Sequence, residues 1–183
     1  HLRGDVGGFV SSVPPEDRFT HWRSEYDTDI QVSLASLAGE RMLFEGDNSS
    51  GVGGDMRSAT RMATLMIGYW GMGRTFTSHA VRRELGIGGG GGGGQRPGED
   101  GEDREEKLLM SGLGEQVEER LSELYEQVTE LLATNRLQVL AVGHALETHL
   151  TITGDDVMAI IDGTEGPFID GRGYYRPEAV EKL

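Results

Sequence analysis

The chain has 183 residues, enough for one domain with a sizeable core or for two small domains. Its formal net charge of -14 argues against a nucleic-acid partner, because such proteins neutralise phosphates with Lys and Arg. It contains no cysteine, so disulfides and thiolate metal sites are excluded and any zinc must be held by His and carboxylate side chains. No apolar run approaches the length of a membrane span, and the first residues do not have the pattern of a signal peptide.

The first part of the chain, residues 1–15, has the pattern of an extended segment. Val6-Gly7-Gly8-Phe9-Val10 places β-favouring residues around a glycine pair, and Pro14-Pro15 ends the run. Glycines inside a strand often mark the close approach of another backbone, although a bulge or a plain bend explains them equally well. We therefore expect a small strand or hairpin near the N-terminus.

A helix is expected from about Arg23 to Phe44. Its apolar residues recur at helical spacing, and the turn residues that follow it, Glu45-Gly46-Asp47-Asn48, mark its end. The stripe consists of Ile30, Leu34, Leu37 and Arg41, with Ala38 and Met42 beside it.

The stretch from Ser50 to Gly71 combines a glycine-rich turn with a second expected helix. The turn delivers one carboxylate, Asp55, to the first turn of that helix. A carboxylate there often does no more than cap backbone N–H groups and complement the helix dipole, so a structural role and a functional role both stay open. The residues that recur at steps of three and four, and so predict one packed face, are Met56, Ala59, Ala63, Met66 and Trp70.

The middle of the chain contains a short helical pattern, from Thr75 to Leu85, followed by seven consecutive glycines, Gly88 to Gly94. A phosphate-binding loop would need a Lys-Ser or Lys-Thr ending and a following helix, and neither is present. The glycines and the charge run from Glu99 to Asp103 therefore indicate a flexible linker or lid.

Regular helical patterning returns at Glu115. This helix either continues through Asn135 or breaks near Ala133-Thr134, and the pattern leaves both open. Thr153 with Asp156 predicts the cap of a further helix. The expected apolar positions are Val117, Leu121, Leu124, Val128 and Leu131 in the first helix and Val157, Ile160 and Ile161 in the last.

The run Gly51-Val52-Gly53-Gly54-Asp55, with Ala59-Thr60 and then Tyr69-Trp70-Gly71-Met72-Gly73, resembles the segment of FtsH-type AAA zinc metalloproteases that carries the third zinc ligand. The order of the later helices is similar to the C-terminal hairpin of that peptidase domain. The resemblance implies a mainly α-helical peptidase domain with a small β element. Its expected parts are the zinc-site half (1–86), a linker (87–106), the helical hairpin (107–163) and a tail (164–183).

In this family the aspartate completes a zinc site, and a Gly-Gly strand borders the active cleft. The resemblance therefore implies that Asp55 is the third Zn²⁺ ligand and that Gly7, Gly8 and Phe9 form the edge to which a polypeptide substrate adds as a strand. It also implies an ATP-using AAA ATPase module in the parent protein, a homo-hexamer, and a cytoplasmic location with any membrane anchor outside this chain.

The family's catalysis also needs His-Glu-x-x-His on one helix, with the Glu as general base, and these 183 residues do not contain that motif. His144 and His149 are five residues apart and so point in different helical directions, while His21 and His79 are isolated in sequence. We expect the motif upstream of residues 2–10 and the ATPase module elsewhere in the parent. By itself this chain is then expected to be inactive on peptides.

A second hypothesis, from another class of protein, stays open. The missing motif and the unusual linker favour a non-catalytic helical adaptor or assembly domain derived from the protease fold. The Gly-Gly-Asp turn and the Gly-Gly strand oppose it, because an adaptor needs no carboxylate at that helix end beyond capping. A regulatory lid formed by residues 88–103 is a third and weaker interpretation.

Overall fold

The computed structural model describes residue 10, residues 19–74, 76 and 78, and residues 112–174. Within these residues the chain is mainly helical, as predicted, and the only β pairing is an isolated bridge between Glu165 and Asp170. Several predicted stretches lie wholly or mostly outside the described residues. They are the Gly7-Gly8 strand, the helical pattern from residue 75 to 85, of which only 76 and 78 are described, the glycine linker and residues 175–183. Among the described helices, none is long and apolar enough to cross a bilayer.

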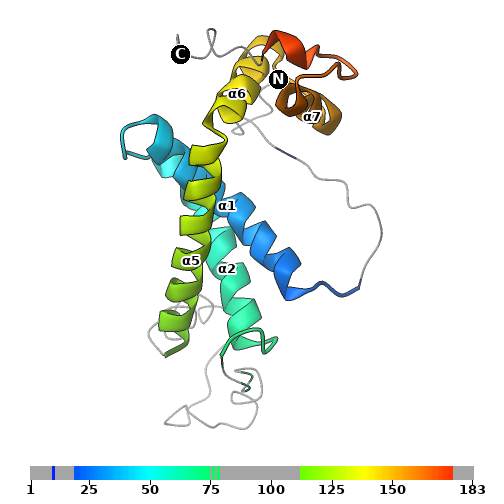
Figure 1. The fold of residues 1–183 in the computed structure, drawn as a ribbon. Coiled ribbons are helices and arrows are strands. Elements are labelled where there is room, and N and C mark those ends of the chain that lie inside the picture. Colours follow the sequence, from blue (N-terminus) through cyan, green and yellow to red (C-terminus); the bar gives the residue numbers. More distant parts are fainter. Residues whose placement is uncertain (1–9, 11–18, 75, 77, 79–111, 175–183) are drawn as a thin grey trace, which may run out of the picture. The chain divides into compact units, whose positions relative to one another are not determined.

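The chain divides into two compact units, of which the larger covers residues 19–131. It contains α1 (Arg23–Leu43), the 3₁₀ turn η1 (Ser50–Val52), α2 (Gly53–Gly68) and most of α5 (Gly112–Thr134). Figure 1 shows α1, α2 and α5 as long rods, and their bounds confirm the three helices expected from the apolar periodicity.

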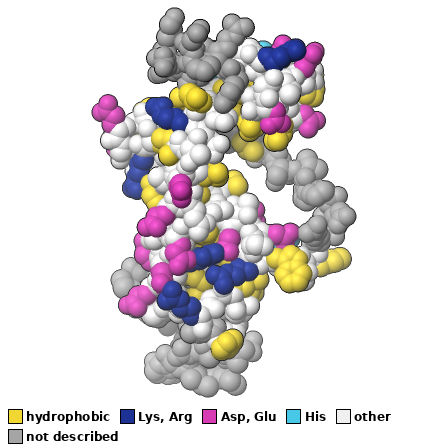
Figure 2. Space-filling model, in the orientation of Figure 1, with side chains coloured by type: hydrophobic (Ala, Val, Ile, Leu, Met, Phe, Trp, Pro, Cys, Tyr) yellow, Lys and Arg dark blue, Asp and Glu magenta, His cyan; other side chains and the backbone are white. Residues whose placement is uncertain are grey.

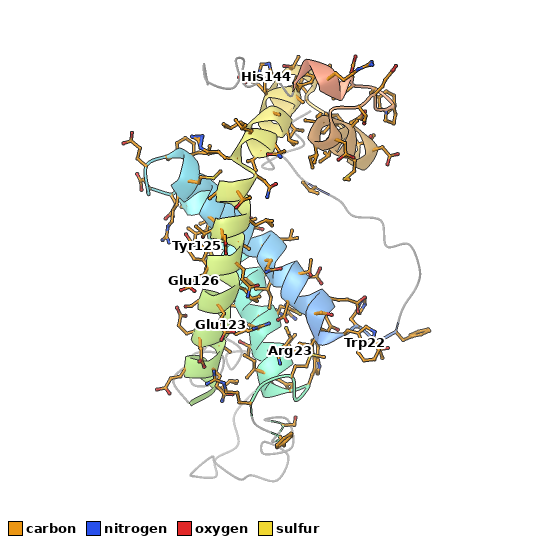
Figure 3. The ribbon with its side chains drawn as sticks, in the orientation of Figure 1. Trp22, Arg23, Glu123, Tyr125, Glu126 and His144 are labelled. Atoms are coloured by element: carbon orange, nitrogen blue, oxygen red, sulfur yellow. The ribbon has the colours of Figure 1, made fainter. Side chains whose placement is uncertain are left out.

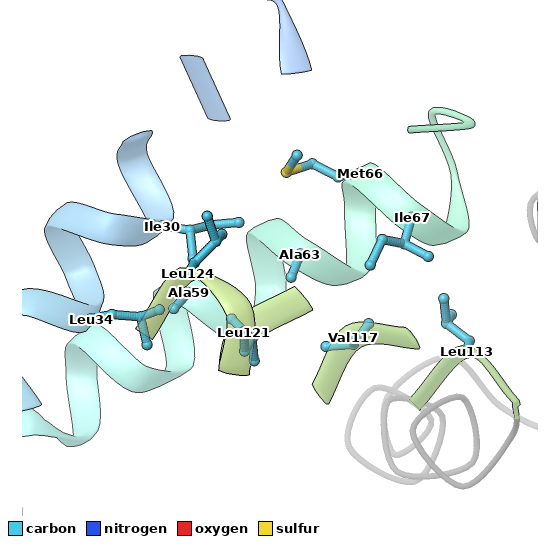
Figure 4. Close-up of a cluster of buried hydrophobic side chains, with 10 residues drawn as sticks. All are labelled: Ile30, Leu34, Ala59, Ala63, Met66, Ile67, Leu113, Val117, Leu121 and Leu124. Atoms are coloured by element: carbon cyan, nitrogen blue, oxygen red, sulfur yellow. The ribbon is translucent and has the colours of Figure 1, made fainter. Parts of the chain in front are cut away.

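These three helices bury their apolar stripes in one core (Figure 4). Because residues three and four apart share a helix face, each stripe supplies several side chains to that core. Helix α2 contributes both small and large side chains to this core. The buried members are Ile30, Leu34, Ala59, Ala63, Met66, Ile67, Leu113, Val117, Leu121 and Leu124.

Charged and polar side chains add links between α1 and α5. Arg120 of α5 donates two hydrogen bonds to Asp27 of α1, at 3.1 Å from Nε and 2.5 Å from Nη2. The hydrogen bond with Asp27 raises the pKa of Arg120 further above its ordinary value, although partial burial opposes this. Arg41 of α1 donates to the Tyr125 hydroxyl at 3.3 Å and lies over its ring.

The smaller unit contains the end of α5, then α6 (Arg136–His149), α7 (Gly154–Asp162) and the 3₁₀ turn η2 (Gly171–Gly173). Helix α5 ends at Thr134, and α6 begins at Arg136. Of the two predicted alternatives, a continuous helix or a break near Ala133-Thr134, the break is therefore correct. The cap predicted for α7 is confirmed, since the Thr153 side chain accepts from the backbone N–H of Asp156. The core of this unit contains Ala141, Ala145, Ile160 and Ile169.

The segment after α7 folds back onto that helix. Ile169 is buried, and Gly171 lies directly against the backbone of α7 at Ala159 and Ile160. Part of the stretch expected as a tail is therefore packed in this structure, at residues 164–174, whereas the domain boundary itself stays a prediction.

Three residues expected on apolar faces are substantially exposed. Trp70 is 44% exposed, Leu131 62% and Ile161 39%. Trp70 follows the end of α2, and Leu131 lies beyond the last α5 residue of the larger core. Periodicity therefore identified the correct helix faces but not the length over which a neighbour covers them.

Candidate functional site

Asp55 lies in the first turn of α2, as the glycine-rich pattern predicts. Its side chain is exposed, and its carboxylate makes no hydrogen bond or ion pair with the residues that the structure describes. The residue before the helix, Val52, is buried and anchors the turn to the core. Asp55 therefore presents a carboxylate without a partner among the described residues, on an exposed first helical turn that directly follows buried Val52.

The turn that leads to Asp55 is also held by α1. The Ser49 backbone N–H and hydroxyl both donate to the Glu40 carboxylate, the hydroxyl at 2.9 Å. The Ser49 hydroxyl in turn accepts from the Gly51 backbone N–H at 3.0 Å, which caps the turn from Ser50 to Val52. One carboxylate on α1 thus determines the path of the chain just before Asp55.

A neighbouring link strengthens the same loop. Arg41 donates from Nε to the Asn48 side-chain oxygen at 3.2 Å, one residue along from the Glu40 contact. Consecutive residues of α1 therefore hold consecutive residues of the loop. The sequence pattern did not single out Glu40, because its partner Ser49 is nine residues away in a turn.

The described part of the chain contains no group of three or more His, Asp and Glu side chains placed to hold a metal ion. His144 and His149, expected to point apart on α6, both contact Tyr174: the His144 ring centroid is 5.6 Å from that of Tyr174, and His149 Nε2 lies 2.6 Å from the Tyr174 hydroxyl. Their partner comes from the segment expected as a tail, so their spacing in sequence could not reveal it. Asp55 has the chemistry of a zinc ligand, but any further ligands would come from residues outside this described part.

Two clefts open on the larger unit. The first has an apolar floor and a charged rim, with Arg23, Arg74 and Arg120 facing carboxylates. Arg74 pairs with Glu119, Arg120 pairs with Glu123, and Asp27 pairs with both Arg23 and Arg120, so each arginine of this rim has a carboxylate partner. Figure 2 shows basic and acidic side chains side by side on this face.

The second cleft lies among α1, α2 and α5 and is mainly apolar at its floor, where Leu34, Leu37 and Leu121 are buried. Tyr125 and Glu126 of α5 border it, and Figure 3 shows both on the same helix. Neither cleft is lined by Asp55.

A buried carboxylate, Asp156, was predicted only as part of a helix cap. It is fully buried and also accepts backbone N–H groups from Phe168 at 2.9 Å and Ile169 at 3.1 Å. Burial alone would raise the pKa of Asp156, but these bonds and those from the Thr153 hydroxyl and backbone hold it below its ordinary value. Asp156 therefore joins α7 to the segment that follows it.

Comparison with known proteins gives the chain its family. The model of peptidase family M41 matches residues 2–160. The ATP-dependent zinc metalloprotease FtsH 2 of Symbiobacterium thermophilum is 32% identical over 159 residues, which cover 87% of this chain and 25% of that protein. The ATP-dependent zinc metalloprotease FtsH of Thermus thermophilus is 29% identical over 164 residues, covering 88% of this chain and 24% of that protein.

A more distant relative, the ATP-dependent zinc metalloprotease YME1L of Drosophila melanogaster, is 23% identical over 164 residues, covering 89% of this chain and 20% of that protein. The chain thus spans about a quarter or less of the length of these relatives. The matches confirm the resemblance that the residues around Asp55 carry. The chain belongs to peptidase family M41.

Proposed function

We propose that this chain is part of the peptidase domain of an ATP-dependent zinc metalloendopeptidase that degrades unfolded or membrane-associated proteins, with Asp55 as the third zinc ligand. The observation that carries the proposal is the exposed carboxylate of Asp55 at the start of α2, in a member of this peptidase family. Its carboxylate is exposed, has no partner among the described residues and is held at the start of α2 by a turn tied to α1. A carboxylate without another described partner, at the position where this family has its third zinc ligand, is available to a metal ion.

The residues of this chain would contribute binding and orientation. Asp55 would hold the metal through a carboxylate oxygen, and the packed helix α2 would keep that oxygen in place. Zinc, when bound, supplies Lewis acidity for peptide-bond hydrolysis. Two histidines and the glutamate that acts as general base would come from a His-Glu-x-x-His helix upstream, as the family resemblance implies.

The substrate and the assembly follow from the same proposal. A polypeptide would add as an extra strand along Gly7, Gly8 and Phe9, which lie outside the described residues. An AAA ATPase module in the same parent would use ATP to unfold and deliver it, within a homo-hexamer on the cytoplasmic side. The names of the relatives, all ATP-dependent zinc metalloproteases, support the use of ATP and the proteolytic role of the parent.

The test is the amount of zinc per chain in the full-length natural protein, measured by elemental analysis with peptidase activity alongside. We expect about one zinc per chain in the natural protein, as in a catalytic site with a single metal. Asp55→Ala should lose both zinc and activity while its helical circular dichroism is unchanged.

The matched control is Asp155→Ala, which removes another exposed aspartate from the first turn of a helix, α7. It should keep zinc, because it shares the helix-end position of Asp55 but not the proposed role. Full activity in Asp55→Ala would eliminate the zinc-ligand assignment. No zinc in the natural protein would favour the adaptor hypothesis instead.

A further inference from the structure

The carboxylate of Glu40, on α1, accepts two hydrogen bonds from Ser49, in the turn just before Asp55. Both of its oxygens are used: one accepts the Ser49 backbone N–H, and the other accepts the Ser49 hydroxyl at 2.9 Å. Glu40 is half-buried and faces the turn from a well-packed helix. A solvent-facing glutamate on a helix surface does not need two protein hydrogen bonds, because water is an equally good partner.

The Ser49 hydroxyl links Glu40 to the next residues of the turn. It donates to Glu40 and accepts from the Gly51 N–H at 3.0 Å, so both of its hydrogen-bonding roles are assigned. A Cβ added at Gly51 would lie 3.0 Å from the same hydroxyl oxygen, so the glycine lets the turn close tightly around it. From Gly51 the chain enters α2 through the buried Val52.

We infer that Glu40 is a positioning residue for Asp55: through Ser49 and Gly51 it sets where the first turn of α2 begins, and so where the Asp55 carboxylate points. This inference rests on the proposed function, because it assigns Glu40 a role toward the metal that Asp55 would hold. Groups that orient a metal ligand commonly affect metal affinity 10- to 100-fold without contacting the metal.

A test at position 40 has to remove both acceptor oxygens. A glutamine there keeps one acceptor for the Ser49 N–H, and its NH₂ group can donate to the Ser49 hydroxyl, which has two acceptor lone pairs and so still accepts from Gly51. Alanine removes both contacts of Glu40 and is therefore the informative substitution.

The experiment uses the full-length natural protein and measures its zinc affinity by competition with a chelator. Glu40→Ala and Ser49→Ala should each weaken zinc binding by about 10- to 100-fold. The double variant should be no weaker than the worse single variant, because both changes break the same chain of hydrogen bonds. Backbone amide exchange at Gly51 should become faster in both, while the thermal midpoint stays within error of the natural protein.

The matched control is Glu45→Ala, which removes a carboxylate of the same kind from the turn that follows α1. Glu45 is exposed and forms no hydrogen bond or ion pair with the described residues, so zinc affinity should not change. Natural zinc affinity in Glu40→Ala, in a protein whose Asp55→Ala variant has lost zinc, would overturn the positioning role and leave the proposed function standing. Retention of zinc by Asp55→Ala would overturn both.

Discussion

Gly171→Ala tests the packing of the segment that follows α7. The φ angle of Gly171 is not in the left-handed region, so alanine meets no backbone restriction there. Its added Cβ, however, would lie 2.7 Å from the Ile160 backbone nitrogen and closer still to the Ala159 carbonyl group. Ordinary contacts begin at about 3.4 Å, and helix backbone cannot rotate away as a side chain can.

The cost follows from the two ways in which the protein can respond. Holding the segment in place means overpacking, which costs about 1–3 kcal/mol. Releasing the segment exposes Ile169, now 3% exposed, and the loss of a buried isoleucine costs about 1.5–3 kcal/mol. Because the cheaper response prevails, we expect the free energy of unfolding of this unit to fall by about 1–3 kcal/mol.

Urea denaturation measures this change, and amide exchange at Phe168 and Ile169 reports release of the segment, since both N–H groups are bonded to Asp156. The matched control is Gly173→Ala in the same turn, where an added Cβ meets nothing within 4 Å. Its stability should match that of the natural chain. If Gly171→Ala is equally stable and keeps both amides protected, the close packing of this segment on α7 is refuted.

Two further predictions concern the same unit. Gly143 lies inside α6, is exposed and has open space where a Cβ would point, so Gly143→Ala should raise the free energy of unfolding by about 0.5–1 kcal/mol in the same urea assay; a decrease would show that a neighbour covers this position. Asp156 has a lowered pKa when folded, so its contribution to stability is full above its ordinary value of 3.8 and is lost as pH falls through the folded pKa. Acid titration followed by Phe168 amide exchange should therefore show release of the segment only below pH 3.8, as pH falls through the lowered pKa. Asp156→Ala, which removes the oxygen that accepts from Phe168 and Ile169, should release it already at neutral pH. A segment that stays protected in Asp156→Ala would contradict this account.

Much of the helical structure follows from local rules. The apolar spacing of α1, α2 and α5 predicts their buried faces, and Thr153 with Asp156 predicts the start of α7. The glycine-rich turn likewise predicts that Asp55 begins a helix. These signals work because a helix face and a cap depend on residues three or four positions apart.

The tertiary structure decided which side chains act between elements. Glu40 binds Ser49 nine residues away, Asp156 binds Phe168 twelve residues away, and His149 meets Tyr174 twenty-five residues away. Periodicity shows which face of a helix is apolar, but not which loop returns to it or how far a neighbouring helix covers it, as the exposure of Leu131 shows. The sequence by itself thus determined the helices and the placement of Asp55 at a helix start. Only the packing of distant segments decided that Glu40 supports its turn and that Asp156 is a buried anchor, because those hydrogen bonds exist only once the chain has folded.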